Sequence, residues 1–189
     1  LSAYMSGLLQ KISSLFGIKK KSVKVIMIGL NNSGKSTIVG QLKSEGEKNS
    51  EIVPTVGLNV EQFRYQNVLF TTFDMSGQGK YRYIWEKYYK TCDGIIFVVD
   101  SSDRLRLAVA RDELHLLLQH PDIASRRIPI LFLANKMDVR EALSSVKIAT
   151  AFGLENIKDK PWHIFATNGL TGEGLQVGVE WFTEQLIQT

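Results

Sequence analysis

The segment GLNNSGKS, residues 29–36, combines two glycines, a lysine and two hydroxyl groups in one short stretch. It matches the pattern G-x-x-x-x-G-K-[ST], in which backbone N–H groups surround phosphate oxygens. The apolar run VKVIMI precedes it and a helical pattern follows it, as this motif requires. In such a loop Lys35 reaches the β- and γ-phosphates and the Ser36 hydroxyl binds Mg²⁺. We therefore predict a nucleoside-triphosphate site, rather than a plain glycine turn, at Asn32, Gly34, Lys35, Ser36 and Thr37.

A second polar cluster, NKMD at residues 135–138, follows the apolar run IPILFLA. The Asp138 carboxylate can accept hydrogen bonds from both the N1–H and the exocyclic amine of guanine, whereas adenine offers no such pair of donors. A site built around a polar partner strongly rejects analogues that lack it. We expect Asn135 to contact the base and neighbouring loops, and the stem of Lys136 to cover the purine face. The cluster favours guanine, and its alternative is a solvated turn.

The segment FATNG, residues 165–169, ends the last predicted strand. We expect the backbone N–H of Ala166 to reach the guanine O6, with Thr167 beside it in the same site. Alone this motif is a weak signal, because an ordinary loop has a similar composition. Its position after NKMD strengthens the prediction.

Candidates for metal binding and hydrolysis lie in IVPTVG, residues 52–57, and FDMSGQG, residues 73–79. Thr55 is a candidate second hydroxyl ligand for Mg²⁺ after Ser36, although the segment also fits an ordinary strand start. Asp74 ends a strand next to the phosphate-loop strand, where a carboxylate suits a Mg²⁺ held partly through water. The N–H of Gly77 is expected to bond a γ-phosphate oxygen, and Gln78 to orient the attacking water. A neutral amide donates and accepts without placing charge beside the phosphate.

Composition is that of one globular domain: 189 residues, of which 44% are hydrophobic and 22% charged. The net charge of +4 favours an anionic partner but does not by itself indicate nucleic acid. The single cysteine, Cys92, excludes an intramolecular disulfide framework and fits a reducing compartment. No apolar run reaches the roughly 18 residues of a spanning helix, and the first residues lack a secretory signal pattern. We therefore expect a cytoplasmic protein.

Short β-branched runs alternate with longer helical patterns along the chain. Gln66-Asn67 joins two alternating runs, which predicts a hairpin. The remaining strand–helix alternation predicts an α/β fold with a mostly parallel sheet and helices on both faces, and ligands bind such sheets at the carboxyl ends of the strands. The predicted strands are Val23–Gly29, Leu58–Tyr65, Val68–Asp74, Gly94–Asp100, Ile128–Ala134 and Trp162–Ala166. The predicted helices are Lys35–Lys43, Gln78–Lys90, Arg104–Gln119, Glu141–Ala151 and Gly174–Ile187.

The segment GLLQKISSLFGIKKK, residues 7–21, carries apolar residues at helical spacing followed by three lysines. We predict an amphipathic helix at residues 5–18 that lies on an anionic membrane, where each lysine adds about 1 kcal/mol. The alternative is permanent packing of this face on the domain. Residues 1–4 precede the first methionine and are interpreted as a remnant outside the fold. Because Ser6 precedes Gly7, N-myristoylation is not predicted, and we expect modest, reversible membrane affinity.

The whole motif set resembles the Ras superfamily of small GTPases and, within it, the ADP-ribosylation factor (Arf) and Arf-like branch. The resemblance covers essentially residues 7–188, and one member of the branch is matched more closely by DMSGQG, by HPDI followed by RRIPILF, and by LENIKDKPWHI. The branch features are GLNNSGKST, PTVG before a strand, YRYIWEKYY, IIFVVDSSDR, LANKMD and FATNG. The resemblance implies a P-loop NTPase G domain over residues 19–189. Its sheet would have six strands, one of them antiparallel, with five helices. It also implies a monomer that hydrolyses GTP to GDP with the help of Mg²⁺, and this hydrolysis acts as a timer.

The resemblance further implies a membrane switch. The helix at residues 5–18 is docked with GDP and released with GTP, when the hairpin over residues 58–74 slides. The GTP form then docks on membrane and recruits a BBSome-like coat complex that carries membrane proteins to cilia. An exchange factor and a GTPase-activating protein (GAP) are implied as further partners, nucleic acid is not, and the implied location is peripheral membrane at the cilium or basal body.

The chain departs from the branch at two places. Most of the branch has Trp-Asp-x-Gly-Gly-Gln, whereas Ser76 stands here in place of the first glycine, and a serine tolerates fewer backbone conformations. An exposed Phe/Trp/Tyr trio for effectors is matched by Leu58, Phe73 and Tyr88, so only the tyrosine is kept. This predicts altered partner choice, unless the three side chains simply pack against the hairpin.

Other functions stay open at this point. One alternative is a nucleotide-gated binding module whose hydrolysis is vestigial, and Ser76 is the main support for it. Another is an ATP-dependent kinase, against which Asp138 argues. No arginine of the motif loops is clearly placed as a cis finger; Arg82 is the nearest, so we expect slow intrinsic turnover and a GAP arginine in trans.

Asp100 is predicted to end a strand and Ser102 or Asp103 to cap the next helix. The three histidines, His115, His120 and His163, lack metal-ligand spacing.

Overall fold

The computed structural model describes residues 23–42, 60–65, 68–75 and 82–188. The predicted membrane helix at residues 5–18 lies outside these ranges. So do Leu58, the joint at residues 66–67 and the segment at residues 76–81.

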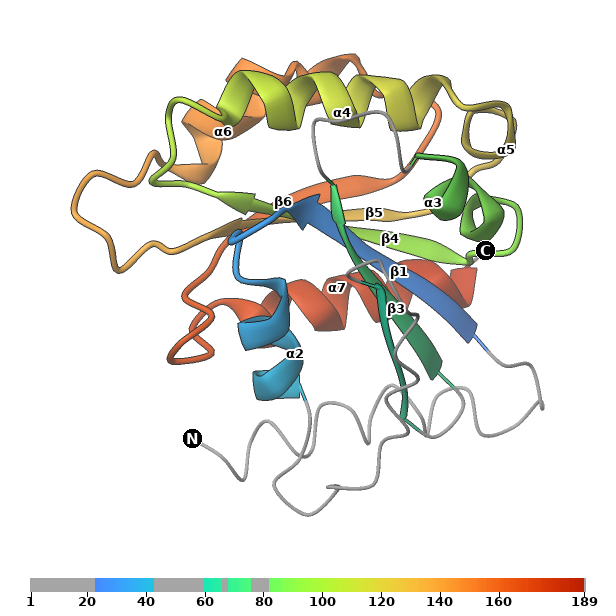
Figure 1. Cartoon of the computed structure of the whole chain (residues 1–189), viewed down its shortest axis with the longest axis horizontal. Helices are drawn as coiled ribbons and strands as arrows, with labels where there is room; N and C mark the ends of the chain where they lie inside the picture. Colours follow the sequence, from blue (N-terminus) through green and yellow to red (C-terminus); the bar gives the residue numbers. More distant parts are fainter. Residues whose placement is uncertain (1–22, 43–59, 66–67, 76–81, 189) are drawn as a thin grey trace.

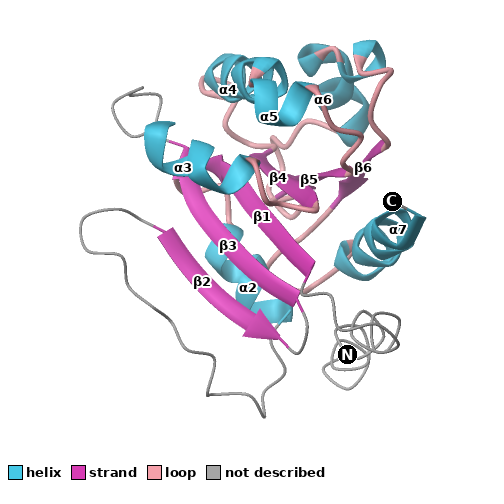
Figure 2. Cartoon of the chain, turned by 90° about the vertical axis from the view of Figure 1, so that its right-hand side faces the viewer, coloured by secondary structure: helices cyan, strands magenta, loops and turns pink. Residues whose placement is uncertain are grey.

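Six strands form one sheet in the order β2-β3-β1-β4-β5-β6, and this confirms the predicted α/β architecture. Every neighbouring pair is parallel except β2 and β3, which form the predicted antiparallel hairpin pair. Figure 2 shows the strands following one another in this order across the twisted sheet. The strands are β1 (Val23–Leu30), β2 (Val60–Tyr65), β3 (Val68–Met75), β4 (Gly94–Asp100), β5 (Ile130–Asn135) and β6 (Trp162–Ala166).

Helices cover both faces of the sheet, with α3, α4, α5 and α6 on one side and α2 and α7 on the other (Figure 1). Parallel strands need crossover connections, and the helices packed on the two faces supply them. The helices are α2 (Lys35–Leu42), α3 (Arg82–Tyr89), α4 (Leu107–Gln119), α5 (Pro121–Ala124), α6 (Ser145–Phe152) and α7 (Leu175–Gln188), with a 3₁₀ turn, η2, at Leu154–Asn156.

The sheet separates two apolar clusters, because successive side chains of a strand point to opposite faces. Ile26 and Ile28 of β1 pack on the side of α3, α4 and α6, whereas Val25 and Met27 pack on the side of α2 and α7. Strand β5 is buried throughout, as a central strand covered on both faces must be. This double burial makes the sheet a rigid base for the loops at its carboxyl edge.

Helices α4 and α6 begin several residues later than predicted. Helix α4 begins at Leu107 and not at Arg104, because residues 101–106 form turns in which carboxylates accept backbone N–H groups. Its N-cap residue is Arg106, without a side-chain cap, so the prediction that Ser102 or Asp103 caps this helix is wrong. Helix α6 begins at Ser145 and not at Glu141, because the Ser144 hydroxyl caps it by accepting from the N–H of Lys147.

Candidate functional site

The ends of the strands that carry the phosphate loop, Asp74, NKMD and FATNG lie at the carboxyl edge of the sheet. Pairing of β4 with β5 sets Asp100 opposite Asn135, and pairing of β5 with β6 sets Ala134 opposite Ala166. On the other side of β1, Gly29 lies opposite Asp74 in β3. Segments far apart in the sequence therefore present their ends at one edge, where open α/β sheets bind ligands.

The phosphate-loop segment is folded tightly around Lys35. The ammonium of this buried side chain donates to the carbonyl oxygens of Gly29 at 3.1 Å and Leu30 at 2.9 Å. Asn32 and Gly34 have left-handed backbones, with φ of 62° and 99°. The loop thus holds a cation at its centre, which suits the capture of a phosphate anion.

Asn135 joins three loops of the site. Its side-chain Nδ2 donates to the Ser33 carbonyl at 2.9 Å, so the NKMD strand end is tied to the phosphate loop. Its Oδ1 accepts from the Gly169 N–H at 2.9 Å and from the Thr167 hydroxyl at 3.3 Å, which ties in the FATNG loop. The side chain is 2% exposed, so these bonds are made out of water and hold the loops in fixed relative positions.

Close approach of these loops explains two of the glycines. A Cβ on Gly34 would lie 2.2 Å from Nδ2 of Asn135, and its φ of 99° is unfavourable for any L side chain. A Cβ on Gly174 would lie 2.0 Å from the Ala166 carbonyl oxygen, at a φ of 76°. Gly34 is therefore needed for the packing of the phosphate loop on Asn135 as well as for the bend of the loop.

The rest of NKMD presents charge at the same edge. Lys136 has a left-handed backbone with a φ of 67°, a costly conformation for a residue with a Cβ and one that concentrates at functional sites. Its Nζ lies 2.8 Å from Oδ2 of Asp100. The Asp138 side chain and Ala166 are both exposed. A carboxylate and a backbone edge thus remain accessible beside the strand ends.

The candidate metal ligands carry hard oxygen donors of the kind that Mg²⁺ prefers. Ser36 is exposed in the first turn of α2, and Thr37 and Asn32 are also exposed. Asp74 occupies a strand position beside Gly29, at the end of the sheet where the phosphate loop begins. These positions fit a Mg²⁺ beside a bound phosphate. Thr55, Gly77 and Gln78 lie outside the described residues, so their placement stays a prediction.

Comparison with known proteins gives the family. A sequence profile described as the ADP-ribosylation factor family matches residues 8–186. The chain belongs to the ADP-ribosylation factor family. It is therefore a small GTPase, a GTP hydrolase with a guanine-nucleotide site, and the expectation from the motifs is confirmed at this level.

Relatives support the closer resemblance carried by DMSGQG, by HPDI with RRIPILF, and by LENIKDKPWHI. The chain is 55% identical over 180 residues to ADP-ribosylation factor-like protein 6 of Danio rerio, covering 95% of this chain and 97% of that protein. It is 46% identical to the protein of the same name from Caenorhabditis elegans, covering 95% of each. The Arl6 BBS3 small GTPase of Trypanosoma brucei, solved with the nucleotide analogue GppNp, aligns with a TM-score of 0.72 at 43% identity, covering 88% of this chain and 98% of that one.

Two interactions of this Arf-family site were not predicted. One is the ion pair between Lys136 and Asp100, where Asp100 was expected only to end a strand. The other is a contact from Arg106 to Asn31 of the phosphate loop. The spacing of Asp103 and Arg106 was a usable signal, since residues three apart in a helical turn form ion pairs. Nothing in the sequence indicated that Arg106 would contact the phosphate loop.

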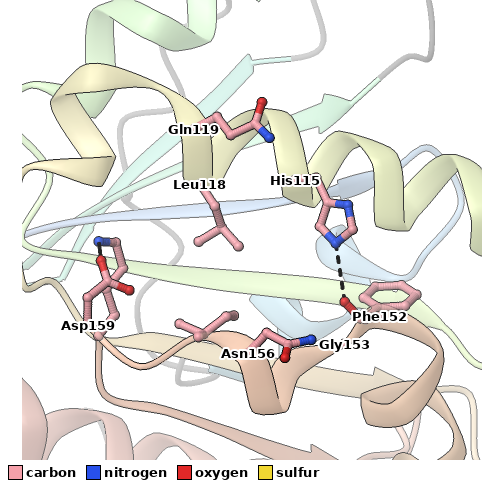
Figure 3. Close-up of a pocket in the computed structure, with 9 residues that line it drawn as sticks. His115, Leu118, Gln119, Phe152, Gly153, Asn156 and Asp159 are labelled. Carbon is pink, nitrogen blue, oxygen red and sulfur yellow. Dashed lines mark hydrogen bonds and ion pairs between the residues drawn. The ribbon is translucent and has the colours of Figure 1, made fainter.

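A hollow lies away from the motif loops, between α4 and the segment that follows α6 (Figure 3). Its volume is about 430 Å³, and His115, Leu118, Phe152, Asn156 and Lys160 are among the residues that line it. Several polar groups there are used internally: His115 Nε2 lies 3.3 Å from the Phe152 carbonyl oxygen, and Lys160 pairs with Asp159. None of the predicted nucleotide residues lines this hollow.

Within the described residues, no helix has the length and apolar character needed to cross a membrane.

Proposed function

We propose that this Arf-family GTPase is a Mg²⁺-dependent molecular switch whose GTP form associates with membrane and recruits a coat complex for ciliary membrane-protein trafficking. The observation that carries the nucleotide part of this proposal is the position of Asn135. It holds the phosphate loop, NKMD and FATNG together at the ligand-binding edge of the sheet. Such preformed positioning is what a tight nucleotide site requires.

In the bound state, the loop from Gly29 to Ser36 holds the phosphates with its N–H groups, and Lys35 neutralises their charge. Asp138 accepts from the N1–H and amine of guanine, and Ala166 donates its N–H to O6. The exposure of Asp138 and Ala166 at the strand ends supports these roles. Guanine selectivity then follows from one carboxylate that adenine would leave unpaired.

Ser36, Thr55 and, through water, Asp74 hold the metal in this proposal. When bound, Mg²⁺ neutralises negative charge on the phosphates and favours transfer to water. Gly77 donates its N–H to the γ-phosphate, and Gln78 holds the attacking water in line. Reduced freedom at Ser76, where the branch has glycine, affects how this segment orders.

The membrane part of the proposal rests on residues 5–18 and the lysines that follow them. An amphipathic helix with basic residues at its edge binds anionic membranes weakly and reversibly. Coupling of this helix to the nucleotide makes membrane binding conditional on GTP. The coat complex, the exchange factor, the GAP and the ciliary location follow from the family resemblance.

Two measurements test the proposal. Single-turnover phosphate release should require Mg²⁺ and GTP, and Gln78→Leu should abolish its stimulation by a cell extract while leaving GTP binding intact. Gln119→Leu, an exposed glutamine on α4, is the matched control and should behave like the parent. Hydrolysis that extract does not stimulate in the parent chain favours the nucleotide-gated module instead.

Liposome co-sedimentation tests the membrane part. The chain should bind anionic liposomes with a non-hydrolysable GTP analogue and less with GDP, and a chain without residues 1–18 should bind with neither. Equal binding in both nucleotide states contradicts the switch.

A further inference from the structure

Arg106, at the start of α4, reaches across to the phosphate loop. Its Nη1 donates to the side-chain Oδ1 of Asn31 at 2.7 Å and to the Asn31 carbonyl oxygen at 3.1 Å. The two residues are 75 positions apart, and the contact joins the loop after β4 to the loop after β1. One guanidinium nitrogen thus holds both the side chain and the backbone of one phosphate-loop residue.

Asp103 fixes the direction of this guanidinium. Its Oδ1 accepts from the backbone N–H of Arg106 at 3.1 Å, and its Oδ2 accepts from Arg106 Nε. A planar guanidinium held at Nε by a carboxylate has little freedom to turn. The Asp103 and Arg106 side chains are 26% and 35% exposed, so the interaction is only partly screened by water.

The hydrogen bond from Arg106 to the Asn31 carbonyl oxygen also fixes the direction of the next backbone N–H group, that of Asn32. In a trans peptide the C=O and the following N–H point in opposite directions. With the Asn31 oxygen turned toward Arg106, the Asn32 N–H is turned to the other side of the loop. Asn32 holds a φ of 62°, a left-handed conformation that a free loop would leave readily.

We propose that Arg106 is a positioning residue for the phosphate site: it locks the Asn31–Asn32 peptide so that the Asn32 N–H faces the bound phosphates. This inference rests on the proposed nucleotide site. It assigns to the loop after β4 a part in GTP hydrolysis that the motifs do not indicate. A fixed N–H donor acts most strongly where negative charge grows during phosphoryl transfer. Its misplacement therefore lowers the hydrolysis rate more than it lowers GDP affinity.

The test compares Arg106→Gln with Arg104→Gln, which removes the same charge from the same loop. Arg104 is exposed and donates to the Glu141 carbonyl at 3.4 Å, away from the phosphate loop. For each variant the single-turnover rate of GTP hydrolysis, the affinity for GDP, the melting temperature and the ³¹P spectrum of the bound nucleotide are measured. We expect Arg106→Gln to slow hydrolysis about tenfold and to shift a ³¹P resonance. Its GDP affinity should change less than threefold, which is roughly half the free-energy change of the tenfold rate effect. Arg104→Gln should match the parent.

Arg106→Lys gives a second variant in case the glutamine disturbs folding. A lysine keeps the charge but loses Nε, so it cannot be held by Asp103 and aimed at Asn31 together. It should restore stability and leave hydrolysis slow. The proposal is overturned if Arg106→Gln hydrolyses GTP at the parental rate with an unchanged ³¹P spectrum, or if GDP affinity and hydrolysis fall equally. A parent chain that neither binds nor hydrolyses GTP refutes the nucleotide site itself.

Discussion

The Lys136 ammonium lies 2.8 Å from the Asp100 carboxylate, and this pair joins the ends of β5 and β4 beside the predicted guanine site. The other carboxylate oxygen, Oδ1, accepts from the N–H and hydroxyl of Ser102. Burial alone would raise the pKa of Asp100, but hydrogen bonds from Lys136 and Ser102 outweigh it and lower the pKa below the usual 3.8. Asp100 is therefore charged at neutral pH and pairs with the Lys136 ammonium at the end of β5.

Asp100→Asn should weaken GDP binding, because the neutral amide attracts the Lys136 ammonium less and frees the NKMD loop. We expect a cost of about 1 kcal/mol, or roughly a fivefold rise in the dissociation constant, measured with a fluorescent GDP analogue. Asp112→Asn is the control, since that carboxylate is 64% exposed and its ion pair is with its sequence neighbour Arg111. Identical affinities for Asp100→Asn and the parent would show that the pair does not support the site.

Asn135→Ala should destabilise the fold by about 3 kcal/mol, because it removes three hydrogen bonds and leaves the Ser33 carbonyl and the Gly169 N–H buried without this partner. Urea unfolding at one fixed excess of GDP measures the effect. The exposed Asn156, changed to alanine, is the control and should stay within about 0.5 kcal/mol of the parent. A loss below about 1 kcal/mol for Asn135→Ala would mean that the loops hold together without it.

Two glycine-to-alanine changes should act in opposite directions. Gly40 lies in α2, and among the described residues nothing lies within 4 Å of its added Cβ, so alanine should stabilise the chain by roughly 0.5 kcal/mol through helix propensity. Gly34→Ala would strike the Asn135 amide and strain a positive φ, so it should lower stability by about 2 kcal/mol or more and weaken GDP binding. Thermal unfolding with GDP measures both. A Gly34→Ala chain as stable as the parent would contradict the packing of the phosphate loop on Asn135.

Cys92 should be unreactive in the folded chain. Its side chain is 1% exposed, and burial raises the pKa of the thiol from 9.0 to about 11, although the nearby Arg126 opposes this rise. At pH 8 a disulfide reagent should label the folded chain far more slowly than the chain in urea. The folded state holds its proton more tightly, so this group's contribution to stability is full below pH 9.0 and declines as pH rises toward about 11. Fast labelling of the folded chain would contradict the burial.

Much of the fold could be predicted from the sequence, because buried parallel strands are continuous apolar runs. The bounds of β4 and β6 match the prediction, whereas β5 begins two residues later than Ile128. The short helix α5 was missed: His120 caps it and Pro121 starts it, and four residues are too few to show a periodic pattern.

The candidate site, like the fold, could be predicted only in part. Motif residues at strand ends were predictable, because the carboxyl ends of parallel strands share one edge. The pairs Lys136–Asp100 and Arg106–Asn31 were not, because each depends on how separate loops lie against one another after the sheet has formed. Aspartate is common both at strand ends and at helix caps, so the residue types of Asp100 and Asp103 do not reveal that they support a binding site. Only the residues that they contact in the folded chain show this role.

Competition for a fluorescent GDP analogue tests the guanine site most directly, with GTP, ATP and xanthosine triphosphate as competitors on the parent chain and on Asp138→Asn. GTP should displace the analogue from the parent, and ATP should fail even at about 1,000-fold excess. Xanthine carries a carbonyl where guanine has its amine, so the asparagine amide can donate to that carbonyl while its oxygen accepts from N1–H. Asp138→Asn should therefore prefer the xanthine nucleotide. Displacement by ATP as effective as by GTP, or an unchanged preference in Asp138→Asn, would contradict a guanine site built on Asp138.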